Sequence, residues 1–216
     1  LSGGRVPANK DFELVWTPDT GSAPRAALFT EKHEGETYAL MMVMPPSNHD
    51  TAKIRLPRET VFIIDTSGSM TGASIEQAKK ALLLAIDRLQ PGDRFNVIQF
   101  NSVTDTLFKD AVPADAANVA RARSYVNGLY ATGGTEMFPA LSAALNNPAP
   151  EGFVRQVIFL TDGAVGNEGQ LFKLIHDRLG DSRLFTVGIG SAPNSHFMSK
   201  AAEFGHGTFT YIGNVN

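Results

Sequence analysis

The chain has 216 residues, of which 43% are hydrophobic, enough for one domain with a full core and a smaller appendage. Its formal net charge is −3 and it has no long basic or acidic block, which argues against nucleic acid and anionic membranes as partners. It has no cysteine, which excludes disulfides and cysteine nucleophiles, and no stretch reaches the roughly 18 apolar residues of a membrane span, so no direct membrane insertion is expected.

Residues 1–52 are predicted to form a β-rich segment followed by a linker. Alternating polar and apolar residues predict strands over 11–16, 26–32 and 37–44, with a hairpin turn at 33–36 between the last two. Two prolines at 45–46 break the pattern and begin the linker. The chain starts Leu1-Ser2-Gly3-Gly4 with no signal peptide, and we expect it to be a fragment of a longer protein.

Residues 53–216 alternate between strand and helix patterns. We predict strands ending at Asp65, at Phe100, at Lys109 (antiparallel to its neighbour), at Thr161, at Ile189 and at Ile212. Helices are predicted from Ser74, whose capping box with Gln77 should begin the first one, and over 114–129, 135–145, 169–179 and 195–204. This pattern predicts an α/β fold: a doubly wound, mostly parallel six-stranded sheet with helices on both faces. With the usual strand order 3-2-1-4-5-6, the winding reverses between the strands ending at Asp65 and Thr161, where ligands bind in such sheets.

The first of these strands ends in a run of oxygen-bearing side chains. The β-branched and aromatic residues 60–64 are typical of a strand buried on both faces. Asp65, Ser67 and Ser69 follow at a spacing of two, so an extended turn can bring their oxygens together, and Gly68 lets the backbone bend. An acid with two hydroxyls at this position favours a small, hard cation.

Two further loops are predicted to complete the site. Thr135 follows a glycine pair, and Asp162 follows the strand on the other side of the reversal. Two carboxylates and three hydroxyls suit Mg²⁺, with Mn²⁺ or Ca²⁺ as alternatives, but leave the ion under-neutralised. We therefore expect it to bind one further anionic oxygen, such as the carboxylate of a protein partner.

The motifs Asp65-x-Ser67-x-Ser69, Gly133-Gly134-Thr135 and Thr161-Asp162-Gly163 resemble the metal-ion-dependent adhesion site of von Willebrand factor type A domains, across about residues 58–213. The resemblance implies that Ser67, Ser69 and Thr135 coordinate Mg²⁺ directly, while Asp65 and Asp162 act through water. An Asp or Glu of the partner then completes the shell.

The residues in and around these motifs are similar to those of inter-alpha-trypsin inhibitor heavy chains. They are also similar to those of bacterial surface proteins of that type in the marine proteobacterial sortase-target group. This resemblance implies that residues 1–52 are the remnant after a so-called VIT domain, and that residues 53–216 are the type A domain without its last helix. It also implies an adhesive module on an extracellular or cell-surface protein, although the sequence holds no sorting signal.

We expect the rim of the site to set partner choice, and the expected rim residues are Met70, Glu136, Met137, Gly163, Ala164 and Val165. Ordinary packing is an equal alternative for the two methionines. Glu136 is expected to be a solvated acid at the start of a helix. Because the site should be a surface crevice, Asp65→Ala or Thr135→Ala is expected to abolish Mg²⁺ binding and leave the fold intact.

Two other functions are alternatives. A phosphoryl-transfer hydrolase with an aspartyl nucleophile also places an aspartate after a central strand, but it needs a second acid where Ser67 stands and a lysine nearby. The chain is therefore predicted not to be an enzyme. An intracellular scaffold of an assembly machine remains open, and an export signal in the full-length protein would argue against it.

Overall fold

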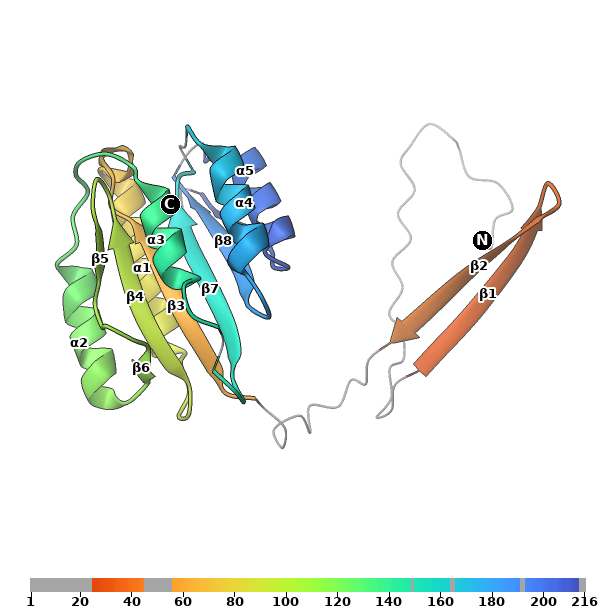
Figure 1. Cartoon of the computed structure of the whole chain (residues 1–216), viewed down its shortest axis with the longest axis horizontal. Helices are drawn as coiled ribbons and strands as arrows, with labels where there is room; N and C mark the ends of the chain where they lie inside the picture. Colours follow the sequence, from red (N-terminus) through yellow and green to blue (C-terminus); the bar gives the residue numbers. More distant parts are fainter. Residues whose placement is uncertain (1–24, 45–55, 149, 164–165, 191–192, 214–216) are drawn as a thin grey trace, which may run out of the picture. The chain divides into compact units, whose positions relative to one another are not determined.

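The structure, a computed structural model, describes residues 25–44, 56–148, 150–163, 166–190 and 193–213 (Figure 1). The predicted strand over 11–16 and the linker from Pro45 lie outside the described residues. By its internal contacts the chain divides into two units, Leu1–Arg55 and Leu56–Asn216.

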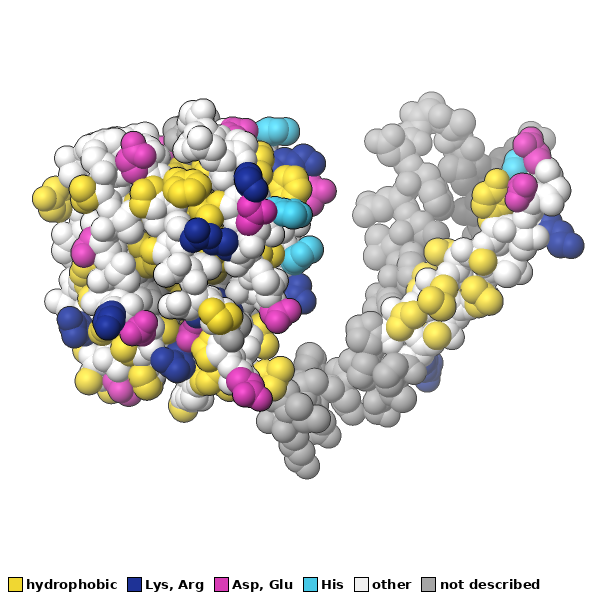
Figure 2. Space-filling view, viewed as in Figure 1, with side chains coloured by type: hydrophobic (Ala, Val, Ile, Leu, Met, Phe, Trp, Pro, Cys, Tyr) yellow, Lys and Arg dark blue, Asp and Glu magenta, His cyan; other side chains and the backbone are white. Residues whose placement is uncertain are grey.

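In the first unit, the predicted hairpin over 26–44 is confirmed. Strand β1 (Arg25–His33) pairs antiparallel with β2 (Glu36–Met44) through a turn at Glu34 and Gly35. Leu28 faces Met41 and Phe29 faces Leu40, so both faces of the ribbon carry exposed apolar side chains, which gather over the two strands in Figure 2.

The second unit is built on a seven-stranded sheet in the order β5-β4-β3-β7-β8-β9, with β6 paired to β4. Its strands are β3 (Arg58–Asp65), β4 (Arg94–Phe100), β5 (Thr104–Thr106), β6 (Val112–Pro113), β7 (Val154–Thr161), β8 (Arg183–Ile189) and β9 (Phe209–Ile212). Strands β4, β3, β7, β8 and β9 run parallel, while β5 and β6 pair antiparallel with β4. The predicted fold class and strand order are confirmed, and the two-residue β6 is the addition.

Helices cover both faces of this sheet. They are α1 (Ala73–Asp87), α2 (Ala116–Asn127), α3 (Met137–Ala144), α4 (Glu168–Arg178) and α5 (Ser195–Phe204). Side chains of α1 and α2 join one apolar core, and those of α3, α4 and α5 join another on the opposite face. Figure 1 shows α3 in front of the sheet and α1 behind it. Strand β3 contributes alternate residues to each core, so Ile63 and Ile64 are both fully buried.

Two local predictions were wrong. The capping box at Ser74 does not form, because α1 follows directly from a 3₁₀ turn (Gly68–Met70) and its N-cap is Gly72. The third strand ends at Thr106 instead of Lys109. Beyond Thr106, the buried Asn96 side chain accepts a hydrogen bond from the Phe108 N–H and donates one to the Phe108 carbonyl. These side-chain bonds take the place of backbone pairing between strands. The Phe108 ring packs edge-on against Phe95.

Candidate functional site

The first loop of the site is ordered by Asp65 itself. The Asp65 Oδ1 accepts a hydrogen bond from the Ser67 N–H at 2.8 Å, and the Ser67 and Ser69 Oγ atoms lie 3.0 Å apart. Asp65 and Ser67 are fully buried, whereas Ser69 is exposed. The loop therefore begins in the core and turns its second hydroxyl toward solvent.

The second loop, which carries Thr135, is fastened to the first by backbone hydrogen bonds. The Thr132 N–H donates to the Thr66 carbonyl at 2.8 Å, and the Gly68 N–H donates to the Gly133 carbonyl at 3.0 Å. A Cβ at position 68 would lie 3.2 Å from that carbonyl oxygen, a tight contact, so the close approach of the two loops favours glycine. Half-buried Thr135 follows Gly133 by two residues and is thereby held beside the first loop.

The third loop is tied to the first through Thr161. Its Oγ1 donates to Asp65 Oδ2 at 2.6 Å and accepts from the Gly163 N–H at 2.9 Å. The half-buried Asp162 lies between these two residues, and its carbonyl accepts from the Asn194 N–H at 2.8 Å. The contacts thus join the three loops that carry the five predicted ligands.

The sequence analysis named Thr161 as part of a motif but gave it no role, and it did not name Ser102. Ser102 follows β4 and accepts from the Gly134 N–H at 2.7 Å, which holds the second loop. Both residues lie at the carboxyl ends of strands next to β3, and this position was the signal that could have identified them.

The electrostatics of Asp65 are those of a buried acid without a basic partner. Burial raises the pKa of its carboxyl, hydrogen bonds from Ser67 and Thr161 act in the opposite direction, and the negative charge of Asp162 raises it further. Within the described residues no Lys, Arg or His forms an ion pair with Asp65. Among the described residues the donors to this carboxylate are hydroxyl and backbone groups, and none of them brings a positive charge.

The donor set fits a small divalent cation. Two ligands at adjacent octahedral positions around Mg²⁺ are about 2.9 Å apart when each metal–oxygen bond is about 2.0–2.1 Å. The 3.0 Å between Ser67 Oγ and Ser69 Oγ matches this edge. Among the described residues no three His, Cys, Asp or Glu side chains converge, so a metal here would depend on the hydroxyls.

Three of the expected rim residues, Met70, Met137 and Gly163, are buried. Met70 and Met137 are 0% and 2% exposed and pack into the two cores, so the packing alternative describes them better. Gly163 is also buried, because its positive φ turns it against Asn194 and Met198 of the α5 region. Glu136 is exposed, as expected, whereas Ala164 and Val165 lie outside the described residues.

The expectation of a surface crevice does not hold for Asp65 and Ser67, which are fully buried, whereas Ser69 of the same loop is exposed. Asp65 and Ser67 belong to the core, and an alanine at position 65 would leave the Ser67 N–H and the Thr161 hydroxyl without their acceptor. Asp65→Ala therefore perturbs the fold as well as the site. Thr135 is half-buried, and the expectation stays reasonable there.

Comparisons with known proteins agree on the family. A model of the von Willebrand factor type A domain matches residues 58–211. Inter-alpha-trypsin inhibitor heavy chain H4 is 36% identical over 160 residues in both Homo sapiens and Bos taurus, covering 68% of this chain and 17–18% of those proteins. The chain therefore spans less than a fifth of the length of these relatives.

Solved structures show the same fold. A von Willebrand factor type A protein from Catenulispora acidiphila has a TM-score of 0.70 at 24% identity, covering 93% of this chain and 49% of that one. Proximal thread matrix protein 1 from the mussel byssus, described with a zinc-occupied MIDAS motif, has a TM-score of 0.54 at 15% identity. The match covers 74% of this chain and 44% of that one. In the described part of this chain, no helix has the length and apolarity needed to span a membrane.

Proposed function

The chain belongs to the von Willebrand factor type A domain family, and from this premise we propose that it is an interaction module that binds Mg²⁺ and, through it, an acidic group of a protein partner. Ser67, Ser69 and Thr135 are proposed to hold the ion directly, and Asp65 and Asp162 through water. The bound ion would supply the positive charge that a partner Asp or Glu binds. Mn²⁺ or Ca²⁺ are the alternative ions.

The environment of Asp65 carries the proposal. A buried carboxylate is costly unless a positive charge or several donors stabilise it. Asp65 is fully buried and has hydroxyl and backbone donors but, within the described residues, no basic partner. A divalent cation at the adjacent hydroxyl pair would provide the missing charge.

The charges of the surrounding loops support a metal-dependent partner. The described residues of the loops that follow β3, β4, β7 and β8, and of the loop before α3, include no Lys or Arg. They do include Glu136 and Asp162, and two further acids border them: Asp65 at the end of β3 and Glu168 at the start of α4. This edge of the domain would repel an acidic group on its own, so an acid could dock only after a cation has bound.

A hydrolase that uses Asp65 as a nucleophile is less well supported. Both carboxylate oxygens already accept hydrogen bonds, from the Ser67 N–H and the Thr161 hydroxyl, and the side chain is fully buried. A nucleophile must reach the reacting atom along an open path. We therefore propose a binding role for this site and no catalytic one.

The cell-surface location is proposed from the family resemblance alone. Labelling intact producing cells with an antibody against the domain tests it. Labelling equal to that of permeabilised cells is the expected result, whereas labelling only after permeabilisation would favour an intracellular scaffold.

Thr135→Val tests the ion-binding part of the proposal. It removes one hydroxyl from a half-buried side chain and keeps its shape. We expect the Mg²⁺ affinity measured by titration calorimetry to fall by about tenfold or more, which corresponds to about 1.4 kcal/mol. Thr132→Val, an exposed threonine in the same loop, is the matched control and should bind as the parent does. Equal affinity in both variants would refute the assignment of Thr135.

Selection from a displayed peptide library tests the partner part. Peptides captured in Mg²⁺ and released by a chelator should contain an Asp or Glu, and Mg²⁺ or Mn²⁺ should restore their binding. If the captured peptides lack Asp and Glu, or stay bound in the chelator, the proposal of an acidic partner is refuted. This holds even if the calorimetric titration confirms Mg²⁺ binding.

A further inference from the structure

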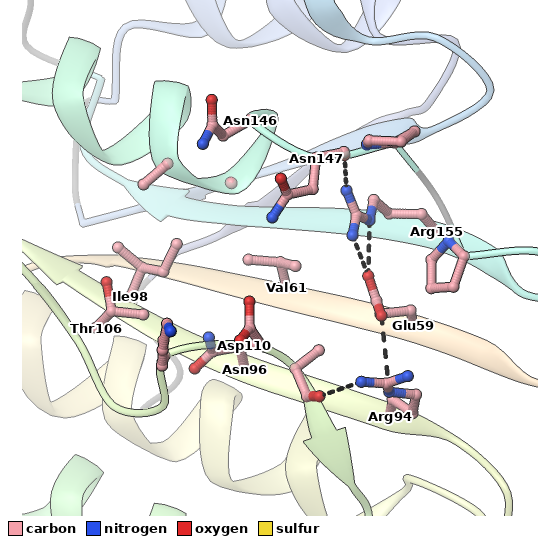
Figure 3. A pocket seen from close by; sticks show the side chains of 16 residues that line it. Glu59, Val61, Arg94, Asn96, Ile98, Thr106, Asp110, Asn146, Asn147 and Arg155 are labelled. Atoms are coloured by element: carbon pink, nitrogen blue, oxygen red, sulfur yellow. Dashed lines mark hydrogen bonds and ion pairs between the residues drawn. The ribbon is translucent and has the colours of Figure 1, made fainter.

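A polar cavity of about 520 Å³ lies at the end of the sheet opposite to Asp65 (Figure 3). Its floor is formed by Glu59 and Val61 of β3, Arg94 and Asn96 of β4, and Arg155 of β7. One wall is the end of α3 and the residues after it. The helix has only eight residues and ends at Ala144, so it leaves this end of the sheet uncovered.

The floor holds a buried charge cluster. Arg155 donates to Glu59 Oε1 through both Nε, at 2.8 Å, and Nη2, while Arg94 Nε lies 3.8 Å from Glu59 Oε2. Glu59 and Arg155 are 2% and 7% exposed. Figure 3 shows the Glu59 carboxylate between the two arginine side chains. Two guanidinium groups thus share one carboxylate, and one positive charge is left over.

The arginines also carry more N–H donors than the described residues accept hydrogen bonds from. Arg155 Nη1 donates to the Asn147 carbonyl, and Arg94 Nη2 donates to the Ala111 carbonyl at 2.6 Å. Together with the bonds to Glu59, these use fewer than half of the N–H donors that two guanidinium groups carry. Arg94 Nε is buried and has no hydrogen-bond partner within the described residues.

The net positive charge of the cavity is not changed by the other charged residues that line it, Lys109 and Asp110, because their charges cancel. A cation would meet the net positive charge of the floor, and an apolar molecule would leave the guanidinium donors without acceptors. An oxyanion would meet both needs, because carboxylate and phosphate groups match the planar guanidinium fork.

We propose that this cavity binds a small molecule through a carboxylate or phosphate group, at a site separate from the divalent-cation site. Arg94 is the main contact, since its side chain is 37% exposed while that of Arg155 is 9% exposed. The ion pair between Glu59 and Arg155 holds the floor in place.

Thermal unfolding of the whole chain, freed of divalent cations on a chelating resin and with inorganic phosphate, acetate or succinate added at constant ionic strength, tests the proposal. Removing the cations beforehand keeps the result independent of the cation site and adds no competing carboxylate. We expect a saturable rise in the unfolding temperature with at least one of these anions, and the anion that acts identifies the group. A rise that does not saturate, or no rise with any of them, would overturn the proposal.

Two variants locate the effect. Ala143→Leu places a larger side chain in the cavity from an exposed position on α3, without altering a charge, and should weaken anion binding by about tenfold or more. Ala120→Leu, at an exposed position on α2 away from the cavity, is the matched control and should bind as the parent does. Arg94→Gln should abolish the saturable rise. Equal binding in Ala143→Leu and Ala120→Leu would mean that the anion binds elsewhere, and the proposal would fail.

Discussion

Strand β3 carries two buried acids, Glu59 near its start and Asp65 at its end, and their surroundings differ. Glu59 lies against Arg155 on the neighbouring strand, with Arg94 nearby. Asp65 accepts hydrogen bonds from Thr161 on that strand and from Ser67. Both acids bridge β3 to β7, but within the described residues Glu59 has basic partners and Asp65 has none. The difference suggests that the first acid serves the fold and that the second needs a charge from outside the chain.

The largest effect is expected when the neutralised acid is changed. Glu59→Gln leaves Arg155 as a buried cation without its partner, and breaking such a pair costs about 3–5 kcal/mol. The free energy of unfolding from urea denaturation should fall by that amount. Glu136→Gln, which removes an exposed acid, is the control and should change the stability little. A loss below about 1 kcal/mol in Glu59→Gln would mean that the pair does not stabilise the fold.

A change at Thr161 is expected to have an intermediate effect on both properties. Thr161→Val removes the hydrogen bond to Asp65 Oδ2 and leaves the Gly163 N–H without its acceptor, which should cost about 1–3 kcal/mol of stability. The Mg²⁺ affinity should fall by about tenfold or more, because residues that orient ligands tune a metal site.

Thr186→Val on β8 is the matched control for this change. Thr186 is also fully buried, and its hydroxyl donates to the Met198 carbonyl at 2.8 Å instead of to Asp65. It should lose similar stability and keep the parent affinity for Mg²⁺. If both variants lose the same affinity, the effect at Thr161 reflects general destabilisation and the proposed link between β7 and the ion is wrong.

The smallest effect is expected at the rim. Glu136 is exposed, so Glu136→Gln should lower the Mg²⁺ affinity by only about twofold at low ionic strength, and salt should screen the difference. Titration calorimetry at two salt concentrations measures this. A loss of about tenfold that persists in salt would identify Glu136 as a ligand of the ion.

The sequence predicted the arrangement of the site better than its details. Runs of β-branched residues identified β3 and β7, and the rule for doubly wound sheets placed Asp65 and Asp162 at the carboxyl ends of adjacent strands. The pairs Glu59–Arg155 and Asp65–Thr161 depend on the register of those strands, which residue patterns alone do not specify.

The rim illustrates the same limit. Met70 and Met137 stand next to site residues in the chain, and their position suggested a surface role. The 3₁₀ turn directs Met70 into the core, and the first turn of α3 directs Met137 into the other core. The direction of a side chain in a tight turn depends on backbone angles that composition and spacing do not determine.

The central claim is that the buried carboxylate of Asp65 helps to bind a divalent cation. Asp65→Asn tests it most directly, because this change keeps the shape of the side chain and removes its charge. Mg²⁺ titration calorimetry should show no binding in this variant, while the parent binds. Urea unfolding in EDTA should give a free energy lower than that of the parent by no more than about 1–3 kcal/mol, because the amide keeps one of the two acceptor oxygens and loses the other. Mg²⁺ binding at the parent affinity would contradict the account.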